Sequence, residues 1–141
     1  MTNGRILVVE DDARIARLHK FHVKQFLQRD VDITADYDTA LGFTRINDYD
    51  FHILDGNFFE NPMNTKKRPL GIPLALEIEA RRPEARGRIV LYSSDEAVLD
   101  GAKKLGIWAY DKSSHTPQDF YSKIKRKIEE LAPRDFKPLL I

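Results

Sequence analysis

Five short apolar runs, each followed by a segment with helical periodicity, constrain the fold of this sequence more than any other feature. Four of the runs are largely continuous, and the first of them, residues 5–9, is rich in β-branched residues; this is typical of strands buried on both faces of a parallel sheet. The run at residues 31–35 alternates between polar and apolar positions, as an edge strand does. The predicted strands are residues 5–9, 31–35, 51–54, 89–92 and 107–110.

The segments between the runs predict five helices. The last is the clearest, because Thr116 is a good N-cap residue and Pro117 fits the first helical position. The fourth, near residues 95–105, is short. The expected inward faces are Ile15, Leu18, His22 and Phe26 in the first helix, Ala40, Phe43 and Ile46 in the second, Ile72, Leu74, Ala75 and Ile78 in the third, and Phe120, Ile124, Ile128 and Leu131 in the fifth.

Regular alternation of strands and helices requires right-handed crossovers and hence a parallel sheet with helices on both faces. We therefore predict an α/β fold: a flavodoxin-like, doubly wound, five-stranded parallel sheet in the order 2-1-3-4-5 with five helices. One domain is expected over residues 1–131, followed by a C-terminal tail over residues 132–141. Ligands of such folds bind where the carboxyl ends of strands one and three meet.

Acidic residues follow both of those strands. Glu10, Asp11 and Asp12 come after the first strand, and Asp55 comes after the third. Clustered carboxylates repel one another, which raises their proton affinity or recruits a cation. Oxygen ligands without a nearby cysteine favour Mg²⁺, completed by a phosphate oxygen, and a carboxylate beside that ion can form an acyl phosphate. Asp12 is more simply interpreted as the cap of the first helix.

Two further strand ends are directed toward the same crevice. The fourth strand ends at Ser93 and Ser94, and Lys112 follows the fifth strand. A hydroxyl and an ammonium would both meet a phosphoryl oxygen placed there.

An acid pair, a lone aspartate, a hydroxyl and a lysine in this order resemble the receiver domain of two-component response regulators, from residue 5 to about residue 131. The matching segments are residues 6–12, 50–55, 71–74, 91–94 and 109–113. The resemblance implies that Asp55 is the phosphoacceptor and a ligand of Mg²⁺, with Asp11 as a second direct ligand. It assigns Glu10 as a ligand or water-mediated helper, and the backbone carbonyl of Asn57 as the last protein ligand.

The resemblance also implies a switch. Ser93 would bond a phosphoryl oxygen and Lys112 would pair with it, drawing the loop after strand four inward. An aromatic side chain on strand five would then turn inward, changing the surface formed by helix four, strand five and helix five. Ala109 stands where that aromatic is expected, so a one-residue gap must restore Tyr110, or the aromatic coupling is altered, with Trp108 also adjacent.

The segment after Asp55 departs from the family pattern. Gly56 follows directly and is expected to loosen the adjacent backbone. The loop from Asp55 to Gly71 is roughly eight residues longer than the family norm, and is either a lid or docking surface, or a tolerated insertion. Its basic run at residues 66–68 is interpreted as solvated.

The favoured function is a switch that phosphorylates and dephosphorylates itself rather than a turnover enzyme. Its partners would be a histidine kinase or phosphotransfer protein and a downstream protein target, with homodimerisation as a further option. The net charge of +1 gives no field that favours nucleic acid or a membrane, and the absence of cysteine and of a long apolar segment near the start suits the cytoplasm.

Two alternatives stay open. A pseudo-receiver would keep the fold as an interaction module without phosphorylation. A Mg²⁺-dependent phosphatase of the haloacid dehalogenase type also uses an aspartate after a strand, but it needs a second aspartate two residues later as general acid and base, and position 57 is asparagine.

Overall fold

Every strand predicted from the apolar runs forms, within two residues of its expected bounds. In the computed structural model, which describes residues 4–114 and 116–131, the strands are β1 (Arg5–Val9), β2 (Asp30–Thr34), β3 (Tyr49–Leu54), β4 (Ile89–Ser93) and β5 (Trp108–Asp111). The helices are α1 (Ala13–His22), α2 (Tyr37–Ile46), α3 (Gly71–Arg81), α4 (Glu96–Lys104) and α5 (Pro117–Glu130), with a π-helical turn η1 (Val23–Leu27) and a 3₁₀ turn η2 (Pro83–Ala85). The expected tail, residues 132–141, lies outside the described residues.

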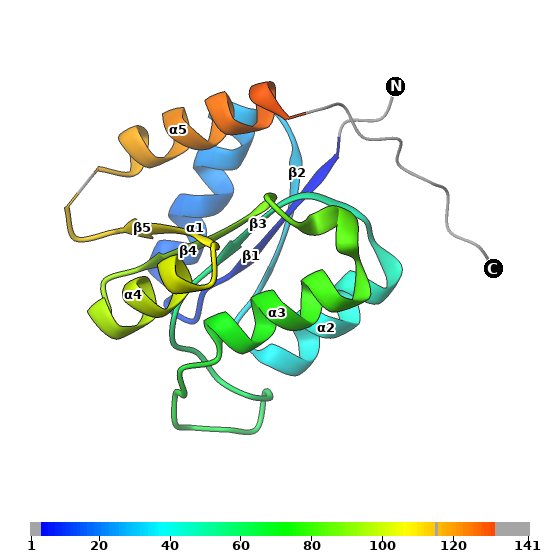
Figure 1. The fold of residues 1–141 in the computed structure, drawn as a ribbon, viewed down its shortest axis with the longest axis vertical. Helices are drawn as coiled ribbons and strands as arrows, with labels where there is room; N and C mark the ends of the chain where they lie inside the picture. The colour runs from blue at the N-terminus through cyan, green and yellow to red at the C-terminus, as the bar shows by residue number, and fades with distance from the viewer. Residues whose placement is uncertain (1–3, 115, 132–141) are drawn as a thin grey trace.

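The strands form one parallel sheet in the predicted order β2-β1-β3-β4-β5 (Figure 1). β1 lies between β2 and β3, and Val9 is in register with both Thr34 and Leu54. β5 pairs with β4 so that Asp111 lies opposite Ser93. Residues that follow β1, β3, β4 and β5 therefore gather at one edge of the sheet.

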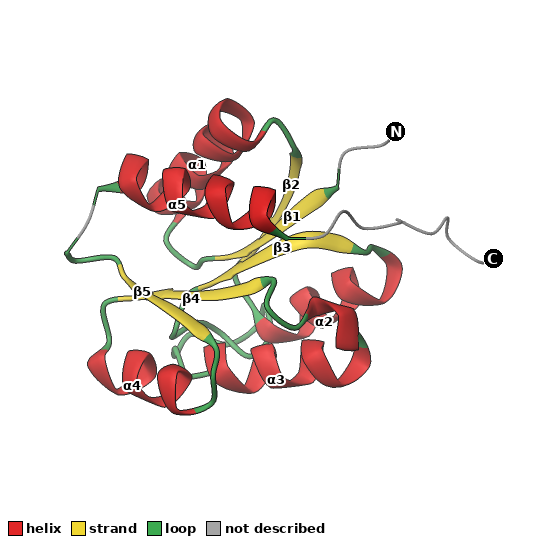
Figure 2. Ribbon diagram, turned by 45° about the horizontal axis from the view of Figure 1, so that its top comes forward, coloured by secondary structure: helices red, strands yellow, loops and turns green. Residues whose placement is uncertain are grey.

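Helices cover both faces of this sheet. α1 and α5 lie on one face, whereas α2, α3 and α4 lie on the other (Figure 2). Ile6 of β1 belongs to one core cluster together with Phe120 of α5, and the next residue, Leu7, belongs to the other with Leu74 of α3. Because successive strand residues point to opposite faces, the continuous apolar runs supply both cores.

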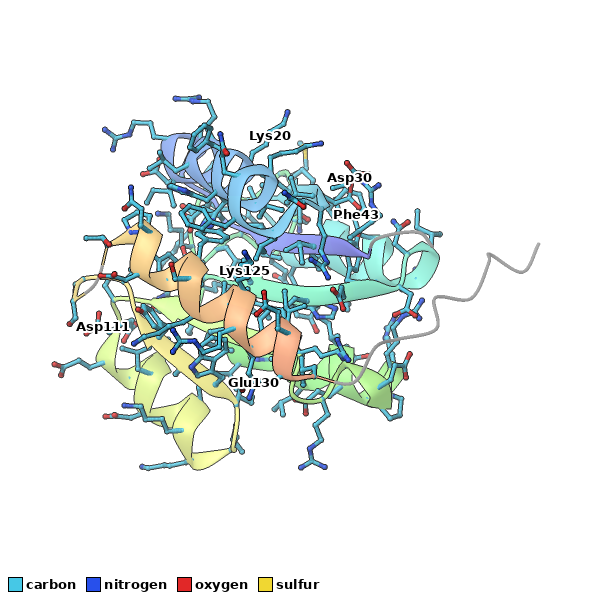
Figure 3. The ribbon with its side chains drawn as sticks, turned by 90° about the horizontal axis from the view of Figure 1, so that it is seen from above. Lys20, Asp30, Phe43, Asp111, Lys125 and Glu130 are labelled. Carbon is cyan, nitrogen blue, oxygen red and sulfur yellow. The ribbon has the colours of Figure 1, made fainter. Side chains whose placement is uncertain are left out.

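The outer surface of the α1 and α5 layer carries many charged side chains, together with the exposed apolar residues Leu18 and Phe21 of α1. Lys20 on α1 and Lys125 and Glu130 on α5 are exposed on this side of the molecule (Figure 3). Within residues 4–114 and 116–131, no helix combines the length and the apolar character that crossing a membrane requires.

Two of the predicted inward positions are wrong. Leu18 is 49% exposed and Ile46 is 55% exposed. In α1 the buried residues are His22, which was predicted, and His19, which a pattern based on apolar residues alone does not count. In α2 the inward position belongs to Thr44, whose hydroxyl donates to the carbonyl of Leu41 at 2.8 Å and is therefore satisfied without water.

The burial of His19 predicts a loss of stability in acid. Its Nδ1 is hydrogen bonded to the hydroxyl of Tyr121 on α5. Burial, followed by the positive charges of Lys112 and His22, lowers the pKa of His19 to about 3. The unfolded chain, whose histidine pKa is near 6.5, binds the extra proton first, so this stabilisation is complete above that pH and is lost as the pH falls toward 3.

Between pH 7.5 and pH 5 we expect the wild-type protein to lose about 2 kcal/mol more unfolding free energy than His19→Gln, because the variant keeps the other histidines but no longer has the neutral imidazole at position 19. Urea titrations of both proteins at the two pH values measure this difference. Equal losses in the two proteins would contradict the assignment.

Candidate functional site

Four strand ends assemble the site predicted from the sequence. Past the last residues of β3 and β5 the ladder continues, with Asp55 N–H donating to the carbonyl of Val9 at 2.9 Å and Lys112 N–H donating to that of Ser93 at 3.1 Å. Glu10 directly follows β1 and its N–H donates to the carbonyl of Thr34. The backbone of each of these residues is thus held by its neighbouring strand, which fixes where its side chain begins.

Three carboxylates converge at this edge. Glu10, Asp11 and Asp55 each place one carboxylate oxygen within 4.8 Å of the others. Burial and then the charge of Asp55 raise the pKa of Glu10 to about 7. Burial likewise raises the pKa of Asp55, against the opposing charge of Lys112. The anionic forms of these carboxylates are therefore poorly solvated, and a bound cation would stabilise them.

Two ammonium groups reach the cluster from separate elements. Lys112, after β5, places Nζ 3.5 Å from Asp55 Oδ1 and 3.9 Å from Glu10 Oε2. Lys67, from the loop between β3 and α3, places Nζ 2.5 Å from Asp11 Oδ2. The hydrogen bond to Asp11 raises the pKa of Lys67.

Residues 66–68 are exposed, as the interpretation of a solvated basic run predicts, but the Lys67 ammonium also pairs with Asp11, which that interpretation did not include. The available signal was the position of the long loop: it leaves the sheet directly after Asp55, so a cation on it can fold back onto the acids. Charge pattern alone does not distinguish that cation from a solvated one.

The residues present fit a hard divalent ion. The donors are three carboxylates, two of them with raised pKa values, and two ammonium groups lie against them, so the cluster already attracts cations. Mg²⁺ and Mn²⁺ both prefer oxygen ligands of this kind. Asp12 stays outside this set. As predicted, it caps α1, accepting from the N–H of Arg14 at 2.9 Å.

Gly56 has a different role from the one expected. Its backbone φ is not positive, so it gives no evidence of special freedom. A Cβ at this position would lie 2.7 Å from Ser93 Oγ and 3.0 Å from the side chain of Val98 on α4. Gly56 therefore permits close approach of β4 and α4 to the residue after Asp55, and it brings the Ser93 hydroxyl to the site.

The Asn57 side chain connects the site to α4. Its Nδ2 donates to Asp95 Oδ2 at 3.1 Å, and Asp95 is the N-cap of α4, accepting from Ala97 N–H at 3.0 Å. The amide nitrogen of Asn57 is thus held by α4, and the metal-binding role that the resemblance implies for its backbone carbonyl stays a prediction. A cleft of about 350 Å³ lies beside this contact, lined by Asn57, Pro69, Ile72, Asp95, Ala97 and Val98.

Tyr110 occupies the buried aromatic position of β5. It is 6% exposed, lies in register with Tyr92, and its ring centroid is 4.9 Å from that of Phe120. Trp108 is partly buried on the same face, 6.1 Å from Phe51, whereas Ala109 packs against the opposite core. Tyr110 is thus the buried aromatic of β5 that a one-residue gap would restore, and the gap itself stays a prediction.

This chain is similar in structure to several solved receiver domains. The CheY-like response regulator receiver domain protein from Methanospirillum hungatei has a TM-score of 0.71 and 23% identity, over 92% of this chain and 96% of that one. The BeF3-activated DrrB receiver domain has a TM-score of 0.65 and 21% identity, over 92% and 100%. The Mn²⁺-bound response regulator Rcp1 has a TM-score of 0.62 and 18% identity, over 94% and 100%.

No protein-family model matches the sequence, and no curated protein matches it. At these identities the structural likeness establishes the fold: the chain has the architecture of response-regulator receiver domains.

Proposed function

We propose that this chain is a phosphoacceptor receiver of a two-component phosphorelay, in which Mg²⁺-dependent phosphorylation of Asp55 switches a protein-interaction surface. The observation that carries the proposal is the convergence of Glu10, Asp11, Asp55 and Lys112 at the carboxyl edge of a sheet with the receiver fold. The donor would be a histidine kinase or phosphotransfer protein, and the output a downstream protein target. We propose a switch in the cytoplasm rather than a turnover enzyme, with no direct nucleic-acid or membrane binding.

Asp55 is the reacting group. One carboxylate oxygen would form a bond to phosphorus as the bond to the donor's nitrogen or oxygen breaks, which leaves an acyl phosphate on the protein. The ammonium of Lys112, 3.5 Å from Oδ1, opposes the pKa rise caused by burial and so favours the anionic nucleophile. Mg²⁺ bound by Glu10, Asp11 and Asp55 would offset charge on the transferring group.

Ser93 and Lys112 would transmit the change. With a phosphoryl group on Asp55, the Ser93 hydroxyl can donate to one of its oxygens and the Lys112 ammonium can pair with another. Ser93 Oγ already accepts from the N–H of Asp95 at 3.0 Å, and Asp95 begins α4. A displacement of Ser93 toward the phosphoryl group would therefore act on the start of α4.

Acetyl phosphate with Mg²⁺ tests the proposal. Intact mass spectrometry should show a gain of one phosphoryl group by the wild type and none by Asp55→Asn, because the amide is not a nucleophile. Asp38→Asn, at an exposed position of α2, is the matched control and should be modified like the wild type. Modification of Asp55→Asn, or wild-type modification undiminished by EDTA, would count against the proposal.

One observation favours the pseudo-receiver alternative. The Lys67 ammonium forms an ion pair with the Asp11 carboxylate, which in a receiver would bind the metal. In a module that never binds metal, the Lys67 ammonium would serve as the permanent counter-charge of the Asp11 carboxylate. Partner binding unchanged by both Asp55→Asn and EDTA would support that alternative.

A further inference from the structure

The loop that supplies Lys67 is anchored at its base. It leaves β3 after Asp55 and returns at α3, and it is drawn in green at the lower edge of the molecule in Figure 1. Phe58 and Arg68 exchange backbone hydrogen bonds of 3.1 and 2.9 Å, and Phe58 is fully buried. Phe59 adds bonds to the chain at Ala35 and Tyr37, so the loop is attached to the start of α2 as well.

Anchoring at Arg68 determines where Lys67 goes. Arg68 turns to Glu60 within the loop, at 3.0 Å, and Lys67 turns to Asp11 in the acid cluster. The contact with Asp11 is thus built into the way the loop is held.

The two partners differ in their access to solvent. The Asp11 side chain is 5% exposed, whereas that of Lys67 is 55% exposed. The carboxylate therefore depends on a nearby cation, while the ammonium can leave for water at little cost. Lys112 differs, since its side chain is only 20% exposed and it pairs with Glu10 and Asp55 instead.

We propose that Lys67 is a tethered counter-ion of the acid cluster, which a divalent ion must displace from Asp11 in order to bind. An ion on the Asp11 carboxylate would lie within a few ångströms of an ammonium in its present position, and like charges at that distance repel strongly. The loop thereby lowers metal affinity and changes its contacts when the metal arrives. This inference rests on the proposed metal-binding function of the cluster.

The probe is Mn²⁺, whose free concentration is read directly by electron paramagnetic resonance. Lys67→Ala should bind Mn²⁺ about tenfold more tightly than the wild type, as expected for removal of one close positive charge. Lys66→Ala removes the same charge from the exposed neighbouring position and should stay within about twofold of the wild type. Lys67→Arg retains the charge and should bind like the wild type.

The outcomes separate this inference from the proposed function. If the wild type binds Mn²⁺ and Lys67→Ala binds equally or more weakly, the counter-ion role is overturned and the metal-dependent receiver stands. If only Lys67→Ala binds, the counter-ion role is supported and metal dependence of the wild type is refuted. If none of the proteins binds Mn²⁺, the counter-ion role of Lys67 and the metal-dependent receiver function are both refuted.

Discussion

Replacing Gly71 by alanine is expected to lower the free energy of unfolding by about 3 kcal/mol, the upper part of the range for overpacking a filled core. A Cβ at this position would lie 2.4 Å from the carbonyl oxygen of Asp55 and 2.8 Å from Leu91 Cδ1. The nearest atom is backbone and is held in place, because Asp55 N–H bonds to β1 and Gly71 N–H donates to the Gly56 carbonyl at 3.1 Å. The backbone at Asp55 and the backbone at Gly71 therefore cannot move apart without breaking one of these hydrogen bonds.

Gly42→Ala is the matched control for this change. Gly42 lies inside α2, and a Cβ there meets nothing within 4 Å. Alanine should therefore stabilise the protein by up to about 1 kcal/mol through its helix propensity. Urea denaturation followed by circular dichroism measures both variants, and a Gly71→Ala protein as stable as the wild type would show that the start of α3 can shift away from Asp55.

The parts of the site that were predictable are those fixed by topology. Glu10, Asp55 and Lys112 follow strands, and the strand order brings their backbones to one edge whatever the intervening loops do. The carboxylate oxygens of this cluster then limit its ligand to a cation, such as a hard divalent metal ion. This is why a chain that matches no family model still indicates its candidate site through residue order.

What the sequence could not indicate depends on loop paths and on packing of polar side chains. Lys67 reaches Asp11 because of a backbone pairing between Phe58 and Arg68 that no periodicity encodes. His19 is buried because an aromatic partner on α5 accommodates its ring, which polarity scales do not include. Gly56 looked like a flexible position, yet its missing side chain leaves the space that Ser93 Oγ and Val98 occupy.

The second large effect is expected at the far end of the sheet, where a buried ion pair fixes the start of β3 and β4. Asp50 Oδ1 lies 2.9 Å from Arg88 Nη1, and Asp50 Oδ2 lies 2.7 Å from Arg29 Nε. The Asp50 and Arg88 side chains are 7% and 8% exposed. Asp50→Ala leaves the Arg88 guanidinium buried without its carboxylate, which should lower the free energy of unfolding by about 3 to 5 kcal/mol.

Asp30→Ala provides the comparison at the surface. Asp30 also pairs with basic side chains, but its own side chain is 64% exposed, so its loss should cost well under about 1 kcal/mol. A double variant, Asp50→Leu with Arg88→Met, should regain part of the stability lost in Asp50→Ala, because the Arg88 charge is then removed and only Arg29, whose side chain is 23% exposed, loses its carboxylate. If Asp50→Ala proves no more damaging than Asp30→Ala in urea titration, water must reach Arg88 and the pair is not a buried anchor.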